Sequence, residues 1–98
     1  MAKLTIVADI TAKPDKIEMV KSELLTLLGP TREEIGCVNY ILHQDNFDPA
    51  HFVLYENWTS HEHWRAHMET HHITSFSKAI EGALESISVK QLSQLELH

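Results

Sequence analysis

Histidine is the residue type that most suggests chemistry in this sequence. The chain has eight histidines in 98 residues, and five of them fall between positions 61 and 72. On one continuous helix, His63, His67 and His71 would recur at i, i+4 and i+8 along a single face. Such a stack suits a divalent metal if a carboxylate such as Glu56 completes the ligand set. No carboxylate lies at an inward-facing helical ligand spacing, so we expect no dedicated metal site, and we expect His61 and His63 to be exposed in the first turn and to bind nothing.

Glu56 is a carboxylate in an apolar setting. It alternates with Phe52, Leu54 and Trp58, so the four side chains share one face of a strand. A carboxylate on an apolar face costs free energy unless it is paired or hydrogen-bonded, and the nearest candidate partner is a histidine of the following helix. A buried Glu–His pair fixes the imidazole tautomer and raises its basicity, as an active-site base requires. A structural hydrogen bond that anchors the helix to the sheet explains the pattern equally well.

Aromatic and amide side chains close to Glu56 in sequence suit a small pocket. Asn39 alternates with Cys37 and Ile41 on another strand, while Tyr40 points to the opposite face, and one of these two rows must face the helices. Tyr40 and Trp58 are core residues more often than ligand contacts. A mostly apolar pocket with a few polar groups is nevertheless what a flat aromatic substrate needs. Cys37 is expected to be a small apolar residue without reactivity.

The elements that must position these residues follow the order β-α-β-β-α-β. Period-two alternation and β-branched residues predict strands at 4–12, 37–44, 52–59 and 87–95. A first helix begins near Pro14 and bends or ends at Gly29-Pro30, and a second runs from about Ser60 to Ala83 with a bend at 70–72. Thr59 and Glu62 have the spacing of a capping box at its start.

This order predicts a single domain over residues 1–98, of the α+β class, with a ferredoxin-like βαββαβ fold and an antiparallel sheet. Helices then cover one face of the sheet and leave the other bare. A chain of 98 residues with one cysteine has a small core and no internal disulfide to support it. We therefore expect a homodimer.

Composition excludes several classes of partner. A formal charge of −6 argues against nucleic acid, because binding phosphates requires a surplus of Lys and Arg. No apolar run approaches the roughly 20 residues that span a bilayer. The sequence starts without the pattern of a signal peptide, so we expect a cytoplasmic protein.

Four segments together resemble a known family. They are EIGCVNY at 34–40, the pair Asp48-Pro49, YENWTS at 55–60 and AHMETHH at 66–72. In this spacing they closely resemble the antibiotic biosynthesis monooxygenase (ABM) domain family, and the likeness extends over roughly 4–95. The family pattern has a histidine, a second histidine five residues later and then an aromatic. His67 and His72 match the histidines, whereas Ile73 replaces the aromatic and Phe76 is available to fill its space.

The resemblance implies a dimeric α+β barrel with a pocket between sheet and helices in each protomer. It also implies a monooxygenase that oxidises a quinol or polycyclic phenol with molecular oxygen and needs no cofactor, so the expected partners are a small aromatic substrate and oxygen. On this basis His67 is expected to be the base, oriented by Glu56, with His72 as second donor or proton relay. The side chains expected to bind the substrate are Asn39, Tyr40, Trp58, Trp64 and Phe76.

Three other functions stay open. Haem-degrading relatives use an asparagine on the first strand, where this chain offers only Asp9 as a polar residue of similar size. An isomerase acting on a phosphorylated, sugar-like signal would need cations, and Arg32 and Arg65 are the only arginines. In a non-enzymatic ligand-binding dimer, Glu56 and His67 would merely tie helix to sheet.

Overall fold

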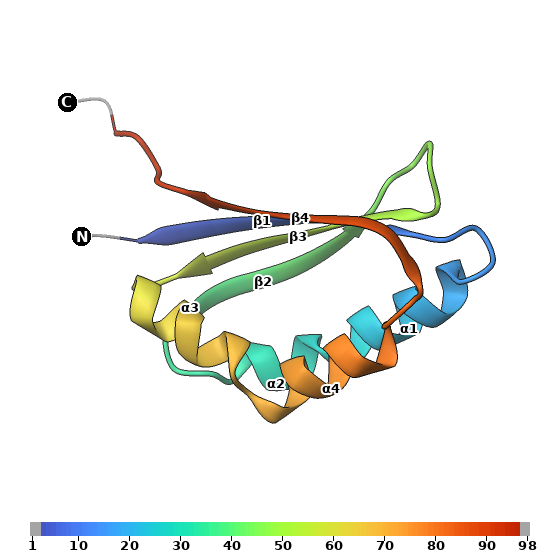
Figure 1. Ribbon diagram of the computed structural model, residues 1–98. Helices are drawn as coiled ribbons and strands as arrows, with labels where there is room; N and C mark the ends of the chain where they lie inside the picture. The colour runs from blue at the N-terminus through green and yellow to red at the C-terminus, as the bar shows by residue number, and fades with distance from the viewer. Residues whose placement is uncertain (1–2, 97–98) are drawn as a thin grey trace.

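The computed structural model describes residues 3–96, which form a four-stranded antiparallel sheet with helices packed on one face (Figure 1). The elements are β1 (Leu4–Ala12), α1 (Ile17–Thr26), α2 (Leu28–Arg32), β2 (Cys37–Gln44), β3 (His51–Trp58), α3 (His61–Met68), α4 (His71–Ala79) and β4 (Leu84–Leu92). The strand order is β2-β3-β1-β4. The predicted ferredoxin-like α+β fold is confirmed. Within the described residues, no helix has the length and apolarity needed to cross a membrane.

The ends of several elements differ from those predicted from the sequence. Ser60 caps α3 by accepting a hydrogen bond from the backbone N–H of His63, so the predicted capping box at Thr59 is wrong. Thr70 caps α4 in the same way, and the predicted bend of the second helix is the break between α3 and α4. Gly29-Pro30 lies inside α2, because the first helical segment ends earlier, at Leu27. The last strand covers 84–92 instead of 87–95.

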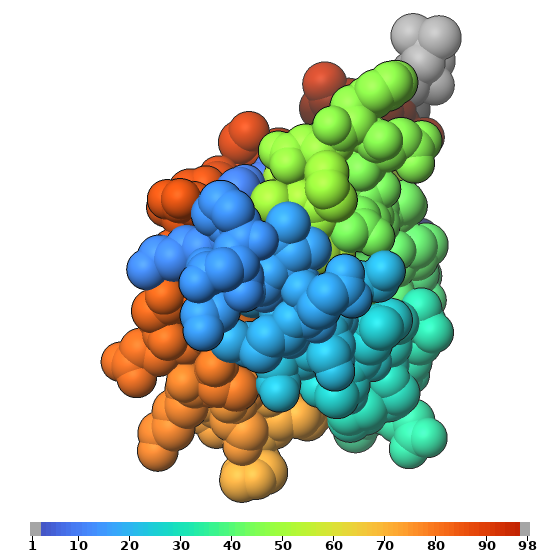
Figure 2. Space-filling model, turned by 90° about the vertical axis from the view of Figure 1, so that its right-hand side faces the viewer, coloured from blue at the N-terminus to red at the C-terminus, as the bar shows by residue number. Residues whose placement is uncertain are grey.

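The face of the sheet that meets the helices carries the core. Residues of β1 and β3 are buried at every second position, and the pairing places Ile6 opposite Glu56 and Ala8 opposite Leu54. The helices add buried Val20, Leu24, Leu27, Ile73, Phe76 and Ile80. Figure 2 shows α1 in blue beside α4 in orange within this helix layer, with the loop between β2 and β3 in green next to the segment that precedes α1.

The other face of the sheet has no helix over it in residues 3–96, as the sequence predicted (Figure 1). It mixes polar with apolar side chains: Thr5, Val7, Asp9, Asn39, Ile41, Val53, Tyr55, Asn57 and Leu92. Ile41, Tyr55 and Leu92 remain 40–44% exposed. Together Ile41, Tyr55 and Leu92 are the apolar strip of this face, and another protein surface can cover such a strip.

Gly36 controls the turn between α2 and β2. Its φ of +89° lies in the left-handed region, and a Cβ added there would overlap the ring of His63. Its carbonyl accepts a hydrogen bond from the backbone N–H of Thr59 at 2.8 Å. Gly36 therefore holds the loop that carries Glu34 against the start of α3.

Replacing Gly36 with alanine should destabilise the fold more than the same change at Gly82. Gly82 has a similar φ of +78° but no atom within 4 Å of an added Cβ, so Gly82→Ala costs only backbone strain, about 1–2 kcal/mol. Gly36→Ala adds the overlap with His63. Urea denaturation of both variants measures the difference, and equal losses would mean that the His63 contact does not matter.

Candidate active site

A cavity of about 100 Å³ lies between the helix-covered face of the sheet and helices α3 and α4. Its wall is mostly apolar, and Glu56 and His67 are its ionisable groups together with the Tyr40 phenol. Met68, Ile87 and Val89 belong to the wall and are 44–55% exposed, so they mark a mouth beside β4. An apolar hollow with few polar groups is the usual form of a small-molecule site.

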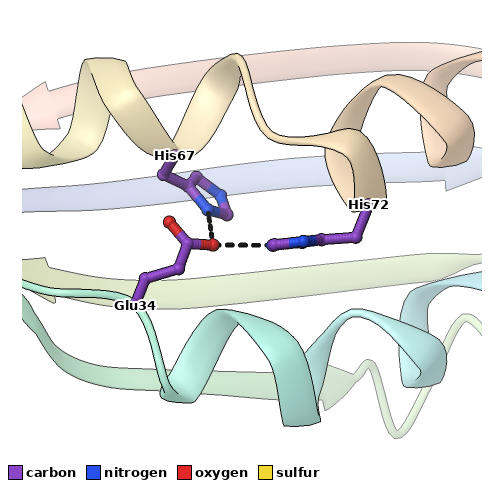
Figure 3. Close-up of side chains that lie close together, drawn as sticks. All are labelled: Glu34, His67 and His72. Carbon is purple, nitrogen blue, oxygen red and sulfur yellow. Dashed lines mark hydrogen bonds and ion pairs between the residues drawn. The ribbon is translucent and has the colours of Figure 1, made fainter.

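His67, in α3, is the buried polar group of this cavity with the clearest chemical role. Its side chain is 2% exposed, and its Nδ1 lies 2.8 Å from Oε2 of Glu34. Nε2 of His72, at the start of α4, lies 2.6 Å from the same oxygen. Figure 3 shows the carboxylate of Glu34 reaching from the loop after α2 toward both rings. One carboxylate oxygen thus accepts hydrogen bonds from two helices.

The Glu34 contact fixes the tautomer of His67. A carboxylate oxygen can only accept, so the proton sits on Nδ1, and Nε2 keeps its lone pair. Burial lowers the pKa of His67, although the hydrogen bond and charge of Glu34 oppose that shift. The ring is held in place by Trp58 and Tyr40, whose centroids lie 4.7 and 5.5 Å away. A neutral, oriented imidazole in a cavity wall has the geometry of a general base.

Glu56 has a different partner from the one predicted. It is 4% exposed and accepts a hydrogen bond from Nε1 of Trp58 at 2.9 Å. Burial raises its pKa to about 7, against the effect of the Trp58 hydrogen bond and with a further rise from the charge of Glu34. The predicted orientation of His67 by Glu56 is wrong, since Glu34 fills that role. The alternation in β3 correctly predicted the face on which Glu56 lies, but the hydrogen bond to His67 is made by Glu34, a loop residue.

Three of the five side chains predicted to bind substrate, Tyr40, Trp64 and Phe76, lie in the cavity wall. Trp58 is fully buried behind the wall and holds Glu56 instead. Asn39 lies on the opposite face of the sheet, where its Oδ1 accepts a hydrogen bond from Asn57 at 3.0 Å. A direct contact of Asn39 with a ligand of this cavity is therefore excluded.

His72 is also outside the cavity wall, and its contact is with Glu34. Within residues 3–96 it supports the carboxylate that orients His67. Glu34 is the residue that the sequence analysis missed as a site residue. It belongs to the EIGCVNY segment, and the glycine two residues later signals a turn, but neither feature points to a histidine partner 33 residues away.

The proposed stack of His63, His67 and His71 does not form. The helix breaks after Met68, so His71 starts α4 and is exposed, whereas Nδ1 of His63 lies 2.9 Å from the hydroxyls of Thr59 and Ser60. The group that could hold a metal is instead Glu34, His67 and His72, whose ligand atoms all lie within 4.8 Å of one another.

A second cluster of ionisable side chains, centred on His51, lies on the bare face, away from the cavity. His51 contacts Asp9 through Nε2 at 2.8 Å and Asp45 through Nδ1 at 3.0 Å. The hydrogen bonds to Asp45 and Asp9 raise the pKa of His51. The cluster links the loop between β2 and β3 to the centre of the sheet.

Glu56→Gln should change stability in a pH-dependent way. The pKa of Glu56 rises from an ordinary 4.5 to about 7 on folding, so the unfolded chain loses this proton at lower pH than the folded chain does. The stability that protonated Glu56 contributes below its unfolded pKa is therefore lost as the pH rises through about 7.

Glutamine does not titrate, so Glu56→Gln lacks this pH-dependent loss of stability. When the pH is raised from about 4.5 to about 8, the free energy of unfolding of the variant should therefore rise by about 2–3 kcal/mol relative to that of the wild type. Urea denaturation of both proteins at the two pH values measures this change. A pH-independent difference would show that Glu56 titrates normally in the folded chain.

The chain is similar in sequence and fold to known proteins. The family model described as antibiotic biosynthesis monooxygenase matches residues 3–79. A crystal structure of PA3566 from Pseudomonas aeruginosa has a TM-score of 0.94 at 36% identity, covering 98% of this chain and 97% of that one. A crystal structure described as an antibiotic biosynthesis monooxygenase has a TM-score of 0.89 at 29% identity, covering 95% and 99% of the two chains.

Two curated relatives are more distant in sequence. The protein described as "Probable quinol monooxygenase YgiN" from Escherichia coli is 25% identical over 99 residues, covering 91% of this chain and 95% of its own length. An uncharacterized protein of Synechocystis, sll1783, is 27% identical over 73 residues, covering 74% of this chain but only 50% of its own length. The family match covers most of the chain, and the solved structures share its whole fold. The chain belongs to the antibiotic biosynthesis monooxygenase family.

Proposed function

We propose that this protein is a cofactor-independent monooxygenase that oxidises a small quinol with molecular oxygen. The observation that carries the proposal is the imidazole of His67, oriented by Glu34 at 2.8 Å, in the wall of an apolar cavity. The description of YgiN as a probable quinol monooxygenase supports the substrate class.

The chemistry needs little from the protein beyond a base and a dry cavity. Ground-state oxygen is a triplet and reacts slowly with closed-shell molecules until one electron is transferred. A quinol anion is rich enough in electrons to donate that electron itself. Nε2 of His67 takes the phenolic proton, and Glu34 stabilises the imidazolium that forms. The apolar wall limits the access of water to the anion and the radical pair. Superoxide then joins a ring carbon to give a hydroperoxide, and cleavage of its O–O bond leaves one oxygen on the ring and releases the other as water.

The size of the cavity favours a substrate with a single ring. About 100 Å³ is below the roughly 300–1,000 Å³ of pockets for drug-sized ligands, and below even the dry cavity of about 150 Å³ that holds benzene. One ring would therefore fill the cavity and extend into its mouth beside β4. Tyr40, Trp64 and Phe76 supply aromatic surface around such a ring. A benzoquinol therefore fits the site better than a polycyclic phenol.

The alternatives receive less support from the residues around the cavity. Asp9, which takes the place of the asparagine expected in haem-degrading relatives, lies on the bare face and contacts His51. Arg32 donates both Nε and Nη2 to the backbone carbonyl of Tyr40, and neither arginine lines the cavity, so a phosphate would find no guanidinium there. Measurable turnover of a quinol would distinguish an enzyme from a non-enzymatic ligand-binding protein.

We further propose that two copies pair through their bare sheet faces. Ile41, Tyr55 and Leu92 would be buried in such a dimer, and their burial would add to the small core of each chain.

Oxygen uptake by metal-free protein with a panel of single-ring and two-ring quinols tests the activity. His67→Ala and Glu34→Gln should each lower the rate by about 100-fold or more, since general-base catalysis contributes about 10²–10⁴. His71→Ala is the matched control, because His71 is exposed and contacts Ser75 at 3.3 Å outside the site. Wild-type rates in His67→Ala would exclude His67 as the base, and no uptake with any quinol would overturn the proposed activity.

Tyr55→Lys tests the dimer. A lysine on each facing surface would bring like charges together without their water, so the dissociation constant should rise at least about tenfold. Leu25→Lys, at a 51% exposed position of α1 on the helix side, is the control and should leave the mass in sedimentation unchanged. Monomeric wild-type protein at all concentrations would contradict the proposed interface.

A further inference from the structure

We propose that Glu34, His67 and His72 form a Zn²⁺ site, and that an ion bound there prevents His67 from acting as a base. The site itself is argued from the geometry of the three side chains. The effect on catalysis rests on the proposed function.

The geometry of the cluster comes close to that of a zinc site. Nδ1 of His67 and Nε2 of His72 both point at Oε2 of Glu34, from 2.8 and 2.6 Å (Figure 3). All three ligand atoms lie within 4.8 Å of one another. In a tetrahedral site with bonds of about 2.0–2.1 Å, neighbouring ligand atoms are about 3.3 Å apart. Withdrawal of the Glu34 carboxylate by about 0.5–1 Å, with a matching small approach of the two imidazoles, therefore opens the space for the ion.

The donor set and its surroundings also suit zinc. Two imidazoles and one carboxylate are a common zinc ligand set, with a water in the fourth position. The histidines stand on separate helices whose N-termini are capped by Ser60 and Thr70. The side chains of His72 and Glu34 are 23% and 14% exposed, which gives an ion a path from solvent to the buried Nδ1 of His67. Within residues 3–96, no other group of three such ligands is this close.

The ion would lie outside the substrate cavity. Glu34 and His72 are not part of the cavity wall, and the cluster is on the Nδ1 side of the His67 ring. The imidazole therefore separates the ion from a substrate at Nε2. This position gives the ion no direct contact with the quinol, and its influence must pass through His67.

That influence follows from the two tautomers of a neutral imidazole. When Glu34 binds Nδ1–H, Nε2 has a free lone pair and accepts a proton. When Zn²⁺ binds Nδ1, the proton must sit on Nε2, which then becomes a donor. Zinc binding at Nδ1 thus removes the free lone pair of Nε2, and it also takes Glu34 away from the imidazole. The free protein is the active form.

Calorimetric titration of chelator-treated, tag-free protein with Zn²⁺ tests the site, with Co²⁺ absorption as a second readout of tetrahedral coordination. We expect one ion per chain. Glu34→Gln and His72→Ala should weaken binding by about 100-fold or more, at least as much as the loss of an outer-shell partner. His71→Ala, next to the cluster but outside it, should bind as the wild type does. Circular dichroism verifies that each variant is folded.

Equal zinc affinity in all four proteins would overturn the site and assign the ion to surface histidines. For the catalytic effect, stoichiometric Zn²⁺ should stop quinol-dependent oxygen uptake in wild type and His71→Ala, and a chelator should restore it. Full uptake by zinc-loaded protein would overturn the inhibition. If metal-free protein oxidises no quinol, the proposed function fails while the titration still decides the zinc site.

Discussion

The carboxylate of Glu34 is the contact on which the organisation of the site depends. It joins three segments, the loop after α2, the end of α3 and the start of α4, through two hydrogen bonds to one oxygen. Placing a carboxylate among packed side chains is costly, and charge-assisted hydrogen bonds offset that cost. The helices can break at 69–70 and still present both histidines to one point, because each is separately capped. Gly36 then holds the loop so that Glu34 reaches them.

Two carboxyl groups, Glu34 partly exposed and Glu56 buried, lie near the cavity in different settings. Glu34 stands behind the imidazole of His67 and sets its tautomer. Glu56 lies in the wall, accepts one hydrogen bond from Trp58 and has its pKa raised to about 7 by burial. Different surroundings thus give two chemically similar groups different partners: Glu34 binds the His67 imidazole, whereas Glu56 accepts from the Trp58 indole. The sequence analysis assigned the orientation of His67 to Glu56.

The two faces of the sheet carry different features. The helix-covered face holds the core and the cavity, while the other exposes an apolar strip beside the His51 cluster. Because strand side chains alternate, a substitution at one position of β3 affects the cavity and one at the next affects the bare face. The proposed activity and the proposed dimer can therefore be tested by separate substitutions.

Local patterns in the sequence determined the fold and much of the cavity wall. Alternation in 4–12 and 51–58 fixed which residues face the helices, including Glu56, because the period of a strand is a property of the backbone. The same rule left open which row of β2 faces inward, and tertiary packing chose Tyr40 over Asn39. Only the tertiary structure decided that Glu34 binds His67. That contact joins residues 33 positions apart and depends on a loop conformation that no periodicity encodes.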